Sequence, residues 1–266
     1  MSDHFDFDRI DIWGPELTER LQGVVPAAAM QRVAESAPDL IEDARGVLLR
    51  QVDPDSLNLT TSQWVSERPI AAYHGSRLTE QDIASIQLSG LKPLNIEDRR
   101  ARLVRTLSRH EGWPANQHRL DEAIELFGTK QRAGRREGQV HLTLSRAGML
   151  KSFSHYMTHG AEVDQHLANH VLGEAGIDLL QTDGSPVVIR CLIPAVTAIA
   201  GMNRYQVEGA PNPVPQVLKY WAYWLAKPNR AVAHIRVDCG IVLKEQMPPD
   251  WISGIERMQD EQLKRK

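Results

Sequence analysis

The chain has 266 residues, of which 42% are hydrophobic and 24% charged, and its formal net charge is −3. This is the composition of a globular protein with one large domain or two small ones, and it excludes a surface that is basic overall. The first residues are acidic and no long apolar run is present. We therefore expect no membrane span, no signal peptide and a cytoplasmic location.

Residues 1–65 have a helical composition and carry no catalytic motif, so we expect an N-terminal helical cap or extension. Within them, residues 57–61 read as a loop or a short strand. The segment 69–73 is short, apolar and strand-like. The helix that follows begins at Thr79, a favourable N-cap with Asp82 three residues later, and ends at Gly90.

The rest of the chain alternates helical and strand-like segments. A helical insertion is expected over 95–138, strands over 140–145 and 187–193, helices over 149–172, and one long strand or two over 232–243. The aromatic helix over 217–225 fits packing in the core, and a final helix is expected from 248 onward. This order of elements predicts an α+β fold, with domains at 1–65 and 66–266.

The two cysteines, Cys191 and Cys239, lie in apolar, strand-like runs without CxxC spacing. We expect buried free thiols in a reducing compartment, and neither a nucleophile nor a zinc site. Histidines at 155 and 159, and again at 166 and 170, have the i, i+4 spacing of helical metal ligands. No HExxH motif accompanies them, so surface histidines are expected and no metal is predicted.

One segment resembles a known family. Tyr73-His-Gly-Ser76, then a short helix, then Gly90-Leu-Lys-Pro93, is similar to the opening of the ADP-ribosyltransferase fold. That fold occurs in diphtheria-type toxins, poly(ADP-ribose) polymerases, bacterial DNA-targeting toxins and tRNA 2′-phosphotransferases. The resemblance implies a split mixed or antiparallel sheet and NAD as the substrate. It implies that His74 contacts the adenosine ribose and that the Gly75 backbone pairs with the nicotinamide amide, with Ser76 beside them.

Further candidate site residues come from the same resemblance or from the residues themselves. The segment 152–156 is similar to the family's Ser-x-Ser-x-x-Tyr motif but one residue short, which assigns the ring stacking on nicotinamide to Tyr156. Packing of Tyr156 on the sheet is an equal alternative. The family's catalytic carboxylate has two candidates, Glu162 and Asp238, of which Glu162 is preferred. Arg77 is a candidate for binding an NAD phosphate, or else for pairing with Glu80. Thr143 and Ser145 offer hydroxyls or are ordinary strand residues.

The resemblance predicts a mono-ADP-ribosyltransferase that transfers ADP-ribose from NAD to a nucleic-acid or protein acceptor. A bacterial toxin or antiphage effector, with an antitoxin as partner, is one biological role of this kind. Arginines are concentrated over 99–136, which suits an RNA or DNA acceptor, although a solvated helix face explains them equally. The alternatives are a non-catalytic binding or regulatory module with a degenerate transferase fold, and an NAD-dependent RNA 2′-phosphotransferase.

Overall fold

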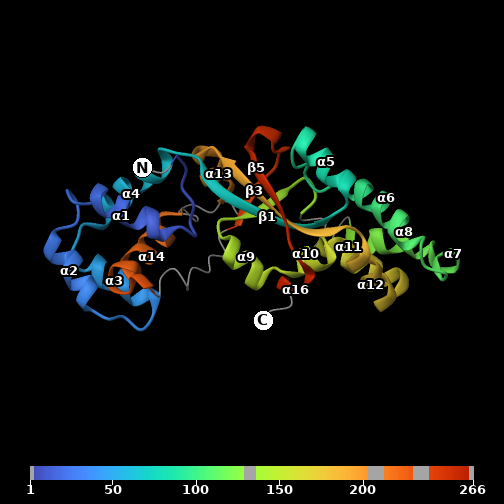
Figure 1. Ribbon diagram of the computed structural model, residues 1–266, viewed down its shortest axis with the longest axis horizontal. Helices are drawn as coiled ribbons and strands as arrows, with labels where there is room; N and C mark the ends of the chain where they lie inside the picture. Colours follow the sequence, from blue (N-terminus) through green and yellow to red (C-terminus); the bar gives the residue numbers. More distant parts are fainter. Residues whose placement is uncertain (1–2, 129–135, 203–212, 230–239, 264–266) are drawn as a thin grey trace. The chain divides into compact units, whose positions relative to one another are not determined.

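The computed structural model describes residues 3–128, 136–202, 213–229 and 240–263 (Figure 1). Within these ranges, helices and one five-stranded sheet make an α+β protein, which confirms the predicted class. The strand order is β4-β2-β1-β3-β5, and β1 pairs with β2 in the antiparallel sense, with Tyr73 opposite Thr143. The strands are β1 (Ile70–Leu78), β2 (Val140–Thr143), β3 (Ser185–Ile193), β4 (Gly240–Leu243) and β5 (Ile252–Arg257).

The chain divides into two compact units. The first comprises residues 1–73, 143–148 and 191–241, and the second comprises 74–142, 149–190 and 242–266. These boundaries differ from those of the predicted domains at 1–65 and 66–266, which stay a prediction. The difference arises because a helix from the second half of the chain packs among the N-terminal helices.

The first unit is mainly helical, as expected for the N-terminal region. Its central helix α14 contacts the four N-terminal helices, and Figure 1 shows it in orange among their blue ribbons. Its buried side chains include Tyr220 and Trp221, which confirms that this aromatic helix belongs to the core. The helices are α1 (Ile10–Arg20), α2 (Ala27–Glu35), α3 (Ile41–Leu49), α4 (Pro54–Ser66), α13 (Ala195–Met202) and α14 (Val214–Ala226).

The expected loop or strand at 57–61 is wrong, because these residues lie within α4. Asp53 caps that helix by accepting a hydrogen bond from the Ser56 amide at 2.9 Å, and Pro54 occupies its first position. Leu57 and Trp64 are buried on its inner face. The packing of this buried face stabilises the helix and outweighs the preference of its threonines for strands.

The second unit has its own core between helices. Helix α11 packs against α6, α8 and α12, as the green and yellow helices of Figure 1 show. The buried core residues are Leu103, Leu107, Leu120, Ala123, Val163, Leu167, Ala168, Val171 and Leu180. The helices are α5 (Glu80–Ser89), α6 (Ile96–Leu107), α7 (Trp113–Asn116), α8 (Arg119–Ala123), η1 (Ile124–Gly128), α10 (His155–His159), α11 (Glu162–Leu172), α12 (Glu174–Thr182), η2 (Pro249–Trp251) and α16 (Asp260–Leu263). Helix α9 (Arg146–Ser152) follows β2.

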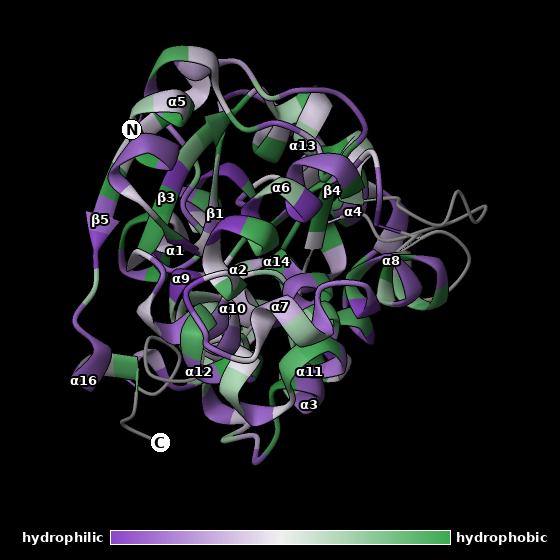
Figure 2. Cartoon of the chain, turned by 90° about the vertical axis from the view of Figure 1, so that its right-hand side faces the viewer, coloured by the Kyte–Doolittle hydropathy of each residue, from purple (hydrophilic) through white to green (hydrophobic). Residues whose placement is uncertain are grey.

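The final helix expected from 248 is also wrong. Only one 3-10 turn, η2, forms there, and the chain continues as the edge strand β5. Its neighbour β3 holds it: the Met258 amide donates to the Pro186 carbonyl at 2.9 Å, and the Ser253 hydroxyl donates to the Arg190 carbonyl at 3.1 Å. Figure 2 shows that β5 ends in hydrophilic residues, which discourage further strands from adding to this edge.

Candidate functional site

Strand β1 places His74 and Gly75 in the second unit. His74 Nδ1 lies 2.8 Å from the carbonyl oxygen of His141 on β2. A carbonyl can only accept, so Nδ1 carries the proton and, in the neutral ring, Nε2 is left with a free lone pair. Burial lowers the pKa of His74, and the charge of Arg99 lowers it further, although the hydrogen bond to His141 opposes both. The imidazole is therefore neutral at pH 7.

Gly75 is in close contact with two methionines. A Cβ added at this position would lie 2.9 Å from Met149 Sδ and 3.3 Å from Met157 Cγ. Met157 belongs to α10, directly after Tyr156, so the helix that carries the predicted aromatic residue packs against Gly75. Glycine is the residue that allows this approach.

Arg77 is buried near the end of β1, directly after the half-buried Ser76. Its Nη1 donates to the Met157 carbonyl at 3.4 Å and to Asp260 at 3.0 Å. The alternative pairing of Arg77 with Glu80 is wrong, because Glu80 pairs with Arg257 at 2.6 Å. Arg77 thus fastens α10 and α16 to β1 in this structure.

Tyr156 and Glu162 come together in a polar cluster with Arg136. Arg136 Nη1 lies 2.6 Å from Glu162 Oε2 and donates to the Tyr156 hydroxyl at 2.9 Å. That hydroxyl donates in turn to Glu162 Oε1 at 3.0 Å. His155 Nε2 lies 3.5 Å from the same oxygen, and its ring lies 4.2 Å from that of Tyr156. One carboxylate thus faces a guanidinium, a phenol and an imidazole.

The electrostatics of this cluster favour an ionised Glu162. Partial burial acts to raise its pKa, but Arg136, Tyr156 and His155 outweigh that effect and the pKa lies below the usual value. Burial raises the pKa of Tyr156, so the phenol keeps its proton for donation to the carboxylate. The side chains of Glu162 and Arg136 are each 39% exposed, which leaves the pair accessible to a solute.

A second ion pair involves the same helix as Glu162. Asp164 is completely buried on α11, and Arg99 Nη1 donates to its Oδ2 at 3.2 Å. Its Oδ1 has no hydrogen-bond partner in the described part of the chain. Gly160, at φ +84°, makes the corner between α10 and α11 that brings Glu162 and Asp164 into place. Sequence reasoning missed Asp164, because its partner lies 65 residues away and no local pattern connects them.

Three predicted residues remain: Asp238, Ser145 and Thr143. Asp238, the second candidate carboxylate, lies outside the described residues. The Ser145 hydroxyl donates to Asp8 at 2.6 Å and accepts from the Gly148 amide at 2.8 Å, so it is used within the first unit. Thr143 is a buried residue of β2. Ser145 and Thr143 therefore behave as ordinary structural residues.

The arginine-rich block makes many internal contacts. Its partners are Asp164 for Arg99, Asp121 for Arg100, Asp183 for Arg102 and Arg109, the Val171 carbonyl for Arg119, and Glu162 for Arg136. Arg102 is buried and Arg105 is exposed. Lys130, Arg132 and Arg135 lie outside the described residues. A charge that is already paired contributes less to phosphate binding, so this block offers a nucleic acid fewer cations than the sequence count suggests.

The histidine pairs have other partners. The Phe127 ring lies 5.8 Å from each of the rings of His166 and His170, and His159 Nε2 lies 2.8 Å from the Gln181 amide. Among the residues that the structure describes, no group of three or more His, Cys, Asp or Glu side chains is placed to hold a metal ion. The same residues include no helix with the length and apolar character needed to cross a membrane.

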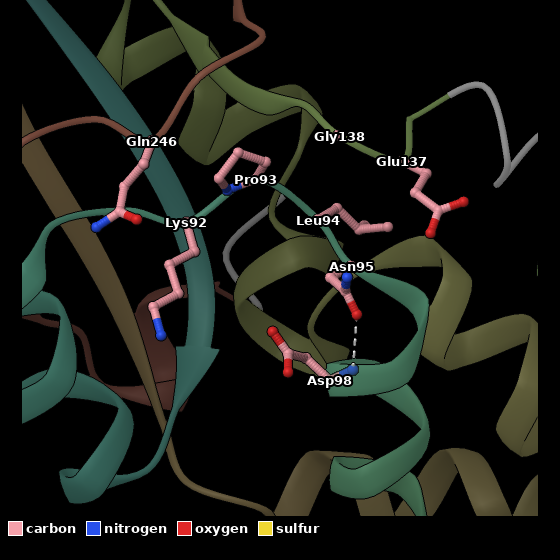
Figure 3. A pocket seen from close by; sticks show the side chains of 8 residues that line it. All are labelled: Lys92, Pro93, Leu94, Asn95, Asp98, Glu137, Gly138 and Gln246. Atoms are coloured by element: carbon pink, nitrogen blue, oxygen red, sulfur yellow. Dashed lines mark hydrogen bonds between the residues drawn. The ribbon is translucent and has the colours of Figure 1, made fainter.

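A separate hollow of about 370 Å³ lies at the start of α6 (Figure 3). Lys92 and Gln246 line one side of it, and Asp98 and Glu137 line the other. Asn95 caps α6 there by accepting from the Asp98 amide at 3.1 Å. None of the predicted site residues lines this hollow.

Comparisons with family models, with curated proteins and with solved structures found no match to this chain. The geometry of the second unit and the resemblance of its motifs are therefore the basis for a function.

Proposed function

We propose that the protein is an NAD-dependent mono-ADP-ribosyltransferase with its site in the second unit. The observation that supports this most is the packing of α10 against β1. Gly75 contacts Met157, and Arg77 binds the Met157 carbonyl, so His74 and Gly75 lie on the strand that the Tyr156 segment packs against. Residues far apart in the sequence, which the family resemblance assigned separately, are thereby joined in one unit.

The chemistry needs little acid–base catalysis, because nicotinamide is a good leaving group. Positive charge develops on the ribose as the bond to nicotinamide breaks, and an ionised carboxylate stabilises that charge. Glu162 is in this state because its pKa is lowered. A neutral His74 with an unprotonated Nε2 suits hydrogen bonding to a ribose hydroxyl. In this assignment Tyr156 would lie along the nicotinamide ring.

The proposal is tested by incubating the purified protein with NAD and measuring free nicotinamide. Glu162→Gln and Asp238→Asn distinguish the two candidate carboxylates, and His74→Ala tests the ribose contact. Glu80→Gln is the matched control, because Glu80 also pairs with an arginine at 2.6 Å but lies outside the cluster. We expect release by the wild type and by Glu80→Gln, and loss in Glu162→Gln and His74→Ala. Absence of release with RNA, DNA and lysate as acceptors would oppose the proposal.

A second candidate, a non-catalytic binding module, is favoured by one observation. The carboxylate of Glu162 already has three polar partners, and Arg77, the predicted phosphate ligand, is buried against Asp260. A binding module would take up NAD or another nucleotide without releasing nicotinamide. Calorimetric binding of NAD combined with the absence of nicotinamide release would identify this second function.

A further inference from the structure

The Arg136 side chain occupies a place that the proposed reaction needs for a cation. Its guanidinium is flat and permanently charged, and it contacts both Glu162 and the Tyr156 hydroxyl. The nicotinamide ring of NAD is also a flat cation, and in the proposed function it lies along Tyr156 while Glu162 faces the ribose bonded to it.

We propose that Arg136 is an internal occupant of a subsite for planar cations formed by Tyr156, His155 and Glu162, and that a ligand must displace it. This inference rests on the proposed function for the identity of the site and adds its regulation. Arg136 begins the turn before β2 and belongs to no helix or strand, so its side chain can leave without unfolding an element. The partial exposure of the pair gives the ligand access from solvent.

The remaining groups are suited to hold a cation once Arg136 has left. Glu162 keeps two neighbours that can donate hydrogen bonds, the Tyr156 hydroxyl at 3.0 Å and His155 Nε2 at 3.5 Å. These two donors hold the carboxylate in place once Arg136 has left. An ionised carboxylate beside a phenol and an imidazole attracts an organic cation through its charge.

The ion pair therefore competes with the ligand. A ligand that binds only after Arg136 has left loses the free energy needed to break the ion pair. Removing Arg136 removes that loss. Because the pair is partly exposed to solvent, the expected gain in affinity is about fivefold. The same substitution leaves the carboxylate and the aromatic residues unchanged.

The test uses 1-methylnicotinamide, a flat pyridinium cation without ribose or phosphate, and measures its dissociation constant by NMR titration of the full chain. Arg136→Ala and Arg136→Gln are each expected to bind it about fivefold more tightly than the wild type. Arg136→Lys keeps a charge near Glu162 and should stay close to the wild type. The matched control is Arg100→Ala, which removes an exposed arginine paired with Asp121 at 2.8 Å and should change nothing.

Two outcomes separate this inference from the proposed function. If Arg136→Ala and Arg136→Gln bind the cation no more tightly than the wild type, the inference is overturned, even if nicotinamide is released from NAD. If both bind it more tightly and the added substitution Glu162→Gln abolishes the gain, the inference holds, even if no variant releases nicotinamide. A gain that survives Glu162→Gln would place the cation elsewhere and would also overturn it.

Discussion

Gly75 and Met149 are so close that a Cβ on Gly75 would lie 2.9 Å from the methionine sulfur. Met157 approaches the same point, at 3.3 Å. Because both neighbours are flexible side chains, they can shift in part, and Gly75→Ala should lower the free energy of unfolding by about 1 kcal/mol. A shift of Met157 disturbs the helix that carries Tyr156, so Gly75→Ala should also slow the proposed release of nicotinamide. Urea unfolding and the NAD assay measure the two effects.

Substitutions of two other glycines should give a larger and a smaller loss of stability for comparison. At Gly90, with φ +83°, the added Cβ would lie 1.8 Å from the Met247 carbonyl oxygen, which is backbone and cannot move aside. Gly90→Ala should therefore cost about 3 kcal/mol or more, from strain and overlap together. At Gly254 nothing lies within 4 Å, and Ala should be nearly neutral. Equal losses at all three positions would contradict the contacts described.

The two arginines Arg100 and Arg102 on α6 should differ sharply in their effect on stability. Arg102 is buried, pairs with Asp183 at 3.4 Å and donates to the Arg77 carbonyl at 2.9 Å. Arg102→Met leaves the buried Asp183 carboxylate with Arg109 and Thr106 only, so we expect a loss of about 3 kcal/mol.

Arg100→Met is the matched control for this substitution. It breaks an exposed pair with Asp121 and should cost at most about 1 kcal/mol. Urea unfolding of the two variants and the wild type gives both values. If both variants lose the same small amount, Arg102 does not stabilise the helix through a buried charge network.

Local signals predicted the first strand and the helix after it. Thr79 accepts from the Asp82 amide at 3.2 Å while Asp82 accepts from the Thr79 amide at 2.9 Å, so the capping box is complete. Gly90 takes the positive φ of a C-cap. The residues that make these interactions lie within a few positions of each other, so the sequence pattern is sufficient to predict them.

Pairings between residues far apart in the chain could not be predicted from the sequence. Strand β5 follows a Pro-Pro-Asp sequence that favours a helix start, and only its hydrogen bonds to β3 make it a strand. The sequence shows that arginines are concentrated over 99–136, but it does not show which carboxylates pair with them. Asp164 and Asp183, the buried partners, lie more than sixty residues from the side chains that they bind. In the candidate site, Tyr156 and Glu162 were predicted one by one, while the role of Arg136 as their common partner depends on tertiary contact.

His74 makes stability depend on pH in a defined direction. Burial lowers the pKa of His74 in the folded chain, so below the unfolded-state pKa of about 6.5 the unfolded chain binds the proton more readily. Stability is therefore lost as pH falls below that value. We expect His74→Gln to lose less free energy of unfolding between pH 7.5 and 5.5 than the wild type does.

Urea unfolding of the wild type and of His74→Gln at both pH values measures this difference. If His74→Gln keeps the full pH dependence of the wild type, the ring of His74 is not desolvated in the folded chain.

Cys191 should be inert to thiol reagents while the chain is folded. It is completely buried on β3, and burial raises the pKa of its thiol to about 12, so almost no thiolate exists at pH 8. The measurement uses Cys239→Ser, which leaves Cys191 as the single cysteine, and follows its reaction with an aromatic disulfide reagent. We expect no reaction in buffer and complete reaction in concentrated urea. Rapid modification in buffer would mean that β3 opens readily. The dependence of the modification rate on urea concentration would then measure the free energy of that opening.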